Sequence, residues 1–234
     1  MRFAEVTLAA PAELTDFYRD GLGLPVDGDT IRIGETRLRF RADAGGAFYH
    51  FALLVPGDRF DAALAWVRER VELVGGVFDF ENWDARAVYF HDPAGNIVEL
   101  IAHHGLDENS RSGEFSASEL VGFSELGIVG DTPSALRTLE SRGLSLWSGT
   151  VEEADRLAFV GEKGRTLILA PPGRGWLPTD RPAEPHPVRA TLAKPTDRSD
   201  LVTVCYLPGR GRDRRRSDGA EPPSGTPSNS LLLD

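Results

Sequence analysis

Apolar and polar residues alternate with a period of two over residues 2–9, which predicts a β-strand. Residues 12–20 are predicted to form a helix, because a proline precedes them and glycines follow them. Two further strands, over residues 30–33 and 36–41, are expected to pair as a hairpin. The first part of the chain is therefore predicted to be a strand, a helix and then antiparallel strands.

This order of elements occurs three times. The second occurrence has strands and a helix predicted over 48–55, 59–70, 77–80, 85–91 and 96–102. The third has them over 121–129, 133–142, 156–160 and 166–170. Two stretches align without gaps: Phe3-x-Glu5 with Phe123-x-Glu125, and the end of the second unit with the end of the third. A repeat this regular indicates stacked modules of one type.

The repeats divide the chain into four parts. Residues 1–104 are predicted to form a two-unit domain, and the polar segment 105–119 a linker. Residues 120–195 hold the third unit. Residues 196–234, rich in Arg, Pro, Gly and Ser, are predicted to be mostly disordered, although 201–207 could form one more strand.

Composition narrows the class of protein. The chain has 234 residues, 41% of them hydrophobic, and a net charge of −10, as expected for a globular domain with an acidic surface. An acidic body argues against nucleic-acid binding, and no apolar stretch is long enough to span a bilayer. The single cysteine, Cys205, excludes an internal disulfide and a cysteine-based zinc site. No signal peptide is recognisable, so a cytoplasmic location is expected.

Three metal-capable side chains stand in the middle of largely apolar strand faces. Glu99 lies between Ile97 and Ile101 in the strand after the turn Asp92-Pro93-Ala94-Gly95-Asn96. His50 and Glu5 occupy similar places in two other strands. A buried carboxylate without a partner is costly, whereas an imidazole and two carboxylates suit a divalent ion. If the strands curl into one concave sheet, these three groups converge.

The stretches FAEVTLAAPAELTDFYRDGLGL, FYHFALLVP and YFHDPAGNIVELIA resemble the vicinal oxygen chelate superfamily. That superfamily includes glyoxalase I, extradiol dioxygenases, fosfomycin-resistance transferases and bleomycin-resistance proteins. The resemblance implies an α+β fold in which paired βαβββ modules form an open, cup-shaped barrel around a metal, with a third βαβββ module here. It implies Glu5, His50 and Glu99 as the metal ligands. Glu5 departs from the pattern, because His is the common residue at that point.

The extra negative charge of Glu5 favours Mn²⁺, Zn²⁺ or Mg²⁺ over Fe²⁺, although the identity of the divalent ion stays open. Glu5 or the other carboxylate could act as a base, and His91 could act as an acid or base at the pocket mouth. The third unit keeps Glu125 but has Ile168 where Glu99 would map, and it has no His in the position of His50. It is therefore predicted to have lost the metal.

The resemblance favours a metalloenzyme that acts on a small oxygen-rich substrate and stabilises an enolate or oxyanion, as a lyase, an isomerase or a ring-opening enzyme. Two alternatives remain: a metal-free small-molecule binding protein of the antibiotic-binding type, and an extradiol-type ring-cleaving dioxygenase. No further cofactor is expected. The partners expected are a small-molecule substrate and, in one arrangement, a second copy of the chain, with neither nucleic acid nor membrane.

Overall fold

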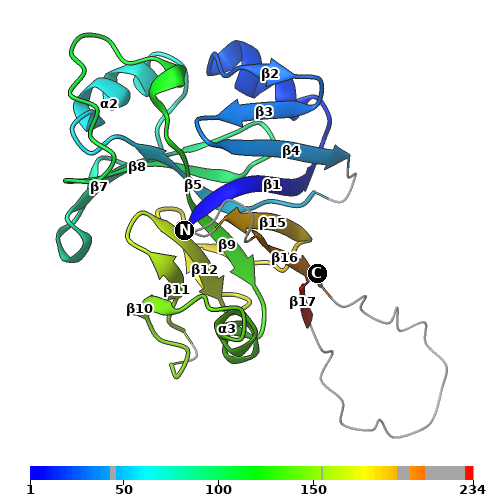
Figure 1. Ribbon diagram of the computed structural model, residues 1–234. Coiled ribbons are helices and arrows are strands. Elements are labelled where there is room, and N and C mark those ends of the chain that lie inside the picture. The colour runs from blue at the N-terminus through cyan, green and yellow to red at the C-terminus, as the bar shows by residue number, and fades with distance from the viewer. Residues whose placement is uncertain (43–45, 154, 194–200, 209–229, 234) are drawn as a thin grey trace, which may run out of the picture.

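The computed structural model describes residues 1–42, 46–153, 155–193, 201–208 and, for the backbone alone, 230–233 (Figure 1). Most of the segment 196–234 that was predicted to be disordered lies outside the described residues, but residues 201–207 form the strand that the sequence allowed. None of the helices in the described ranges combines the length and the apolar character needed to cross a bilayer.

Three βαβββ units follow one another. The first consists of β1 (Arg2–Ala10), α1 (Leu14–Asp16) with a π-helical turn η1 (Phe17–Gly21), β2 (Val26–Asp27), β3 (Thr30–Ile33) and β4 (Thr36–Ala42). The second consists of β5 (His50–Val55), α2 (Phe60–Arg68), β6 (Phe78–Phe80), the turn η2 (Glu81–Trp83), β7 (Ala85–His91) and β8 (Ile97–His103). The third follows the turn η3 (Ala117–Glu119) and consists of β9 (Gly122–Val129), α3 (Thr132–Glu140), β10 (Leu146–Gly149), β11 (Ala158–Glu162) and β12 (Arg165–Ala170). The predicted repeat of elements is confirmed.

The described strands form two large sheets and one small one. The eight-stranded sheet is strongly curled and has the order β10-β11-β12-β9-β5-β8-β7-β6. The seven-stranded sheet has the order β17-β16-β15-β1-β4-β3-β2, with β15 (Val188–Ala193), β16 (Leu201–Leu207) and β17 (Ser230–Leu233) completing it. The strands β13 (Gly175–Trp176) and β14 (Arg181–Pro182) pair separately. In each unit the first and last strands run parallel.

Residues 1–104 were expected to form one domain from the first and second units, but these two units do not pair with each other through their described strands. The second unit pairs with the third, through antiparallel β5 and β9. The first unit instead pairs with a strand from near the end of the described chain, through antiparallel β1 and β15. The segment 105–119 therefore connects two halves of one sheet rather than two domains. The physical reason is that every unit leaves its first strand with a free edge, which any other first strand can fill.

One apolar core lies against both large sheets and holds them together. The rings of Phe3 from β1 and Phe51 from β5 both contact Phe123 of β9, at centroid distances of 6.0 and 5.1 Å. Gly34 sits in the turn between β3 and β4 with a positive φ, and a Cβ there would lie about 2.1 Å from the carbonyl oxygen of Val121. The first unit can therefore approach β9 only because residue 34 has no side chain.

The turn between β7 and β8 sets the position of the second unit's central strands. The buried carboxylate of Asp92 accepts hydrogen bonds from the backbone of Ala94 and Asn96, from the Asn96 side chain and from the Tyr18 hydroxyl. The Asn96 side-chain oxygen in turn accepts a hydrogen bond from the backbone of Tyr49 at 2.8 Å. The turn thus fixes the register of β5 and β8 and ties both strands to the first helix.

Replacing Asp92 by Ala is expected to lower the free energy of unfolding by about 3 kcal/mol, because it leaves several buried donors without an acceptor. Urea unfolding followed by circular dichroism measures this. Asp20→Ala is the matched control, since within the described part of the chain the exposed Asp20 carboxylate bonds only to the neighbouring Arg19. If the two variants unfolded at the same urea concentration, the buried network around Asp92 would not be the clamp described here.

Candidate metal centre

A cavity of about 700 Å³ opens on the curled face of the eight-stranded sheet, between the second and third units. Five aromatic side chains contribute to its wall: Phe80, Trp83, Tyr89, Phe159 and Trp176. His50, Glu99 and Glu125 also line it. The cavity therefore combines apolar walls with a small group of convergent polar side chains, as ligand sites do.

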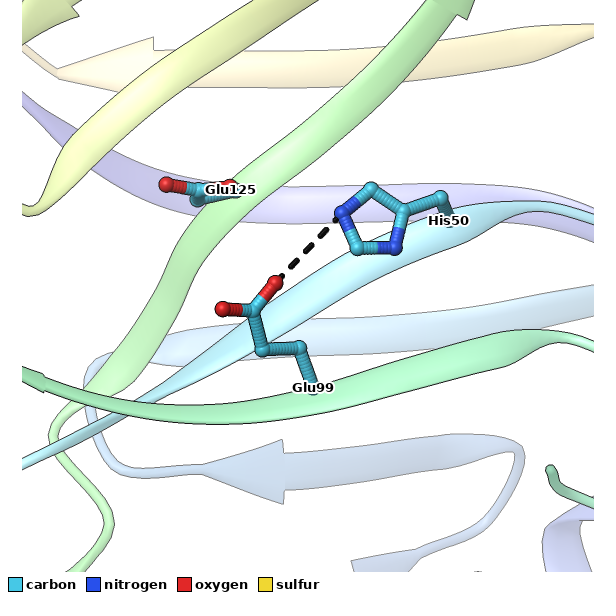
Figure 2. Close-up of side chains that lie close together, drawn as sticks. All are labelled: His50, Glu99 and Glu125. Atoms are coloured by element: carbon cyan, nitrogen blue, oxygen red, sulfur yellow. Dashed lines mark ion pairs between the residues drawn. The ribbon is translucent and has the colours of Figure 1, made fainter. Parts of the chain in front are cut away.

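Three adjacent strands deliver these polar side chains. His50 begins β5, Glu99 lies in β8 on one side of it, and Glu125 lies in β9 on the other side (Figure 2). Each offers one ligand atom, and these atoms all lie within 4.8 Å of one another. The three residues are at most 5% exposed. No other group of three or more His, Cys, Asp or Glu side chains in the described ranges has this geometry.

The His50 ring is held in one orientation. Its Nδ1 atom lies 3.2 Å from the carbonyl oxygen of Ile97, an acceptor, so Nδ1 carries the proton. Nε2 then presents a lone pair, and it lies 3.5 Å from a carboxylate oxygen of Glu99. Two lone pairs that face each other need a proton or a cation between them. An imidazole oriented by a carbonyl is also the usual arrangement of a metal-ligating histidine.

Burial opposes charge on all three groups. Desolvation lowers the pKa of His50 to about 4, with the nearby Arg174 lowering it further and the Ile97 carbonyl partly offsetting the effect. Desolvation raises the pKa of Glu125 to about 8. It also raises the pKa of Glu99 well above its usual value, helped by the charge of Glu125 and opposed by a hydrogen bond with Tyr89. Two carboxyl groups and a neutral imidazole form a donor set that a divalent cation would satisfy in place of protons.

Residues 171–187 are called the strap below, and six of them, between Arg174 and Asp180, line the cavity together with the three side chains. The indole of Trp176 packs on the His50 ring with centroids 5.0 Å apart. Gly127 makes room for it, since a Cβ at that position would lie 2.9 Å from the indole. Arg181 fastens the strap: its guanidinium lies 3.3 Å from the ring centroid of Phe48 and donates to the Gly95 carbonyl at 3.0 Å. The strap thereby shields the inner end of the cavity from water.

The sequence comparisons give no assignment: no family model matches the chain, and no curated protein matches it. Solved structures do resemble it. A Bacillus subtilis protein described as a "putative dioxygenase" is 17% identical, with a TM-score of 0.52, and the match covers 88% of this chain and 81% of that one. Glyoxalase I from Zea mays is 15% identical, with a TM-score of 0.48, over 73% of this chain and 66% of that one. The Bacillus structure shares the fold.

The fold agrees with the one that the resemblance to the vicinal oxygen chelate superfamily implied. The expected class, an α+β arrangement of paired βαβββ modules around a curled sheet, is confirmed. Within this fold His50 and Glu99 lie together, on the strands and faces where the motif placed them.

Glu5 does not join them. It lies in β1 of the other sheet, where its carboxylate bridges Arg37 at 3.5 Å and Arg39 at 3.3 Å. The third side chain of the cluster is Glu125, from the unit that was predicted to have lost the metal. The grouping differs from the expectation for one reason: β5 pairs with β9 and not with β1. The sequence did carry a signal for Glu125, which is the exact repeat of Glu5 in the third unit.

His91 also lies apart from the cavity. It is exposed at the end of β7, and its Nδ1 lies 3.3 Å from the backbone oxygen of Asn96. It does not contribute to the cavity wall, so the structure gives no support to the acid or base role expected for it. Six strap residues line the cavity, Arg174 and Trp176 among them, and no motif in the sequence marks their segment as part of a site.

The metal-free protein should lose stability as the pH rises from about 6.5 to 8. Glu125 keeps its proton in the folded state up to about pH 8 but loses it near pH 4.5 when unfolded, so the folded state binds more protons in this range. The lowered pKa of His50 acts in the opposite direction only below about 6.5. The loss should be at most about 1.4 kcal/mol per pH unit for each carboxyl group.

Urea unfolding of the chelator-treated protein at several pH values measures this slope. Glu125→Gln should reduce it, because the amide does not titrate. A saturating divalent ion should also reduce it, because the ion replaces the proton. Identical slopes for the wild type and Glu125→Gln would show that Glu125 is already ionised in the folded protein.

Proposed function

We propose that this protein is a metal-dependent enzyme of the glyoxalase and dioxygenase type that acts on a small, oxygen-rich substrate. The observation that supports this is the convergence of His50, Glu99 and Glu125 at the inner end of a cavity large enough for a small organic molecule. One imidazole nitrogen and two carboxylates suit a divalent ion such as Mn²⁺, Zn²⁺, Mg²⁺ or Fe²⁺, with positions left for substrate oxygens. Such an ion would act as a Lewis acid that polarises those oxygens.

The side chains around the centre have separate tasks. The Ile97 carbonyl fixes the His50 tautomer so that Nε2 faces the cavity. Tyr89, opposite Glu99 in the ladder between β7 and β8, orients that carboxyl group. Trp176 covers the imidazole and excludes water, which strengthens every electrostatic interaction in the cavity. The protein thus presents a rigid donor set to the substrate rather than a flexible one.

Two features of the cavity suit enolate or oxyanion chemistry. The carboxyl group of Glu125 lies at the cavity surface with a pKa raised toward neutrality, which suits a group that takes a proton from carbon and returns it. Arg174 lines the same cavity, and among the described residues no carboxylate lies within ion-pair distance of its guanidinium. Its charge is available to stabilise negative charge on the substrate.

A metal-free binding protein is the second candidate. The aromatic wall supports it, since Trp83, Phe159 and Trp176 offer flat apolar surfaces that would hold a ring without any ion. In that case the raised pKa values of Glu99 and Glu125 would keep the group protonated and neutral near pH 7. A ring-cleaving dioxygenase is a variant of the first proposal and requires a redox-active ion.

Elemental analysis after loading with Mn²⁺, Zn²⁺ or, without oxygen, Fe²⁺ tests the proposal. We expect about one equivalent of metal per chain in the wild type. Glu125→Gln and Glu99→Gln should each weaken binding by on the order of 100-fold or more, since even residues behind the ligands contribute 10–100-fold. Glu5→Gln is the matched control: it removes a carboxylate from an equivalent strand position and should keep the full equivalent.

The outcomes separate the candidates. Loss of metal in Glu5→Gln with retention in Glu125→Gln would overturn the site described here. No metal in any protein would favour the binding protein, whose ligand affinity should then be unchanged by Glu99→Gln. Bound Fe²⁺ or Mn²⁺ together with substrate-dependent consumption of O₂ would assign the dioxygenase variant.

A further inference from the structure

The seven-stranded sheet repeats the geometry of the metal centre with different residues. In the ladder between β1 and β4, Glu5 lies opposite Arg37 and Thr7 lies opposite Arg39. In the ladder between β5 and β8, His50 lies opposite Ile97 and Ala52 lies opposite Glu99 in the same way.

Across the central strands, Thr7 lies opposite Arg189 of β15, as Ala52 lies opposite Glu125 of β9. Glu5, Arg39 and Arg189 therefore occupy the positions that His50, Glu99 and Glu125 occupy in the other sheet. Both carboxylates of the metal centre are replaced by arginines.

This exchange inverts the charge of the sheet face. Side chains directly opposite one another across neighbouring strands share a face, so Arg37, Arg39, Arg189 and Glu5 all lie on one side of the sheet, with Arg41 further along β4. Glu5 is shared between Arg37 and Arg39. Arg39 also lies 3.6 Å from Asp29, at the exposed edge of the sheet.

Arg41 and Arg189 remain without a carboxylate partner among the residues that the structure describes. Both line a second cavity, of about 290 Å³, together with Thr7, Cys205 and Leu207. Its lining residues come from β1, β4, β15, β16 and the segment before β15. These four strands are neighbours in the sheet. It is far too small for a macromolecule but has room for a small ligand. In a chain of net charge −10, two unpaired arginines in one cavity are a local reversal of the overall charge.

We propose that this cavity binds a small oxyanion, a phosphate or carboxylate group carried by a small molecule. A planar guanidinium donates two parallel hydrogen bonds to such a group, and two guanidinium groups on neighbouring parts of one sheet face can clamp it from both sides. The Thr7 hydroxyl between them offers a further donor. The site does not depend on the metal centre or on the reaction proposed for it.

Cys205 provides a reporter for the cavity. It lies opposite Arg189 in the ladder between β15 and β16, it lines the cavity, and it is the only cysteine of the chain. The rate of its alkylation by the uncharged reagent iodoacetamide can be measured with inorganic phosphate, with succinate, or with chloride at the same ionic strength. By mass action the rate should fall about tenfold at a phosphate or succinate concentration about ten times the Kd. Calorimetry should give one site per chain.

Two variants make the test specific. Arg41→Gln and Arg189→Gln should each weaken phosphate or succinate binding about tenfold, the effect of one charge-assisted hydrogen-bonding group. Arg137→Gln, on the exposed side of α3, is the control and should bind as the wild type does. Glu125→Gln should also bind normally, because the cavity belongs to the other sheet.

The relative affinities of phosphate and succinate identify the class of group. The proposal fails if neither anion protects Cys205 more than chloride does and calorimetry shows no binding. It fails equally if protection survives in a protein that carries both Arg41→Gln and Arg189→Gln.

Discussion

Two carboxyl groups and an imidazole are buried against one another on three adjacent strands of the eight-stranded sheet. Burying these polar groups costs free energy, and the other side chains around the cavity are arranged to offset that cost. No strand supplies more than one of the three groups, so each carboxylate is tolerable alone and costly only when the sheet forms. A divalent ion would remove the cost by binding all three. The Ile97 carbonyl, the Tyr89 hydroxyl and the Trp176 indole then serve to hold the donors still and keep water away.

The strap and the turn at Asp92 connect this centre to the rest of the fold. Arg181 joins them directly, because it packs on Phe48 and donates to the Gly95 carbonyl within the turn. The chain leaves the strap through Pro187, whose carbonyl accepts a hydrogen bond from the Tyr49 hydroxyl, and enters β15 of the other sheet. One continuous segment therefore both packs on His50 and completes the seven-stranded sheet.

The two sheets show how one architecture can carry opposite charges at equivalent positions. The strand pairing around β5 and the pairing around β1 follow the same rule, so the same three places on the face are available in both. Carboxylates in those places favour a cation, and arginines favour an anion. Glu5, which looked like a metal ligand by its position in the repeat, is instead held between Arg37 and Arg39. Glu5 occupies the position that His50 occupies in the other sheet, but the side chains next to it are arginines and not carboxylates.

The sequence by itself determined the local features of this protein. The period-two strands, the repeat of βαβββ units, the Asp92 turn and the faces of His50 and Glu99 all depend on residues close together in the chain. Only the tertiary structure decided which units share a sheet, because each unit's first strand presents the same kind of free edge. The pairing of β5 with β9 placed Glu125 beside His50, whereas Glu5 lies in the other sheet and forms ion pairs with Arg37 and Arg39. The tertiary structure also brought a strap from near residue 176 over the centre, a contact between segments more than a hundred residues apart that no local pattern records.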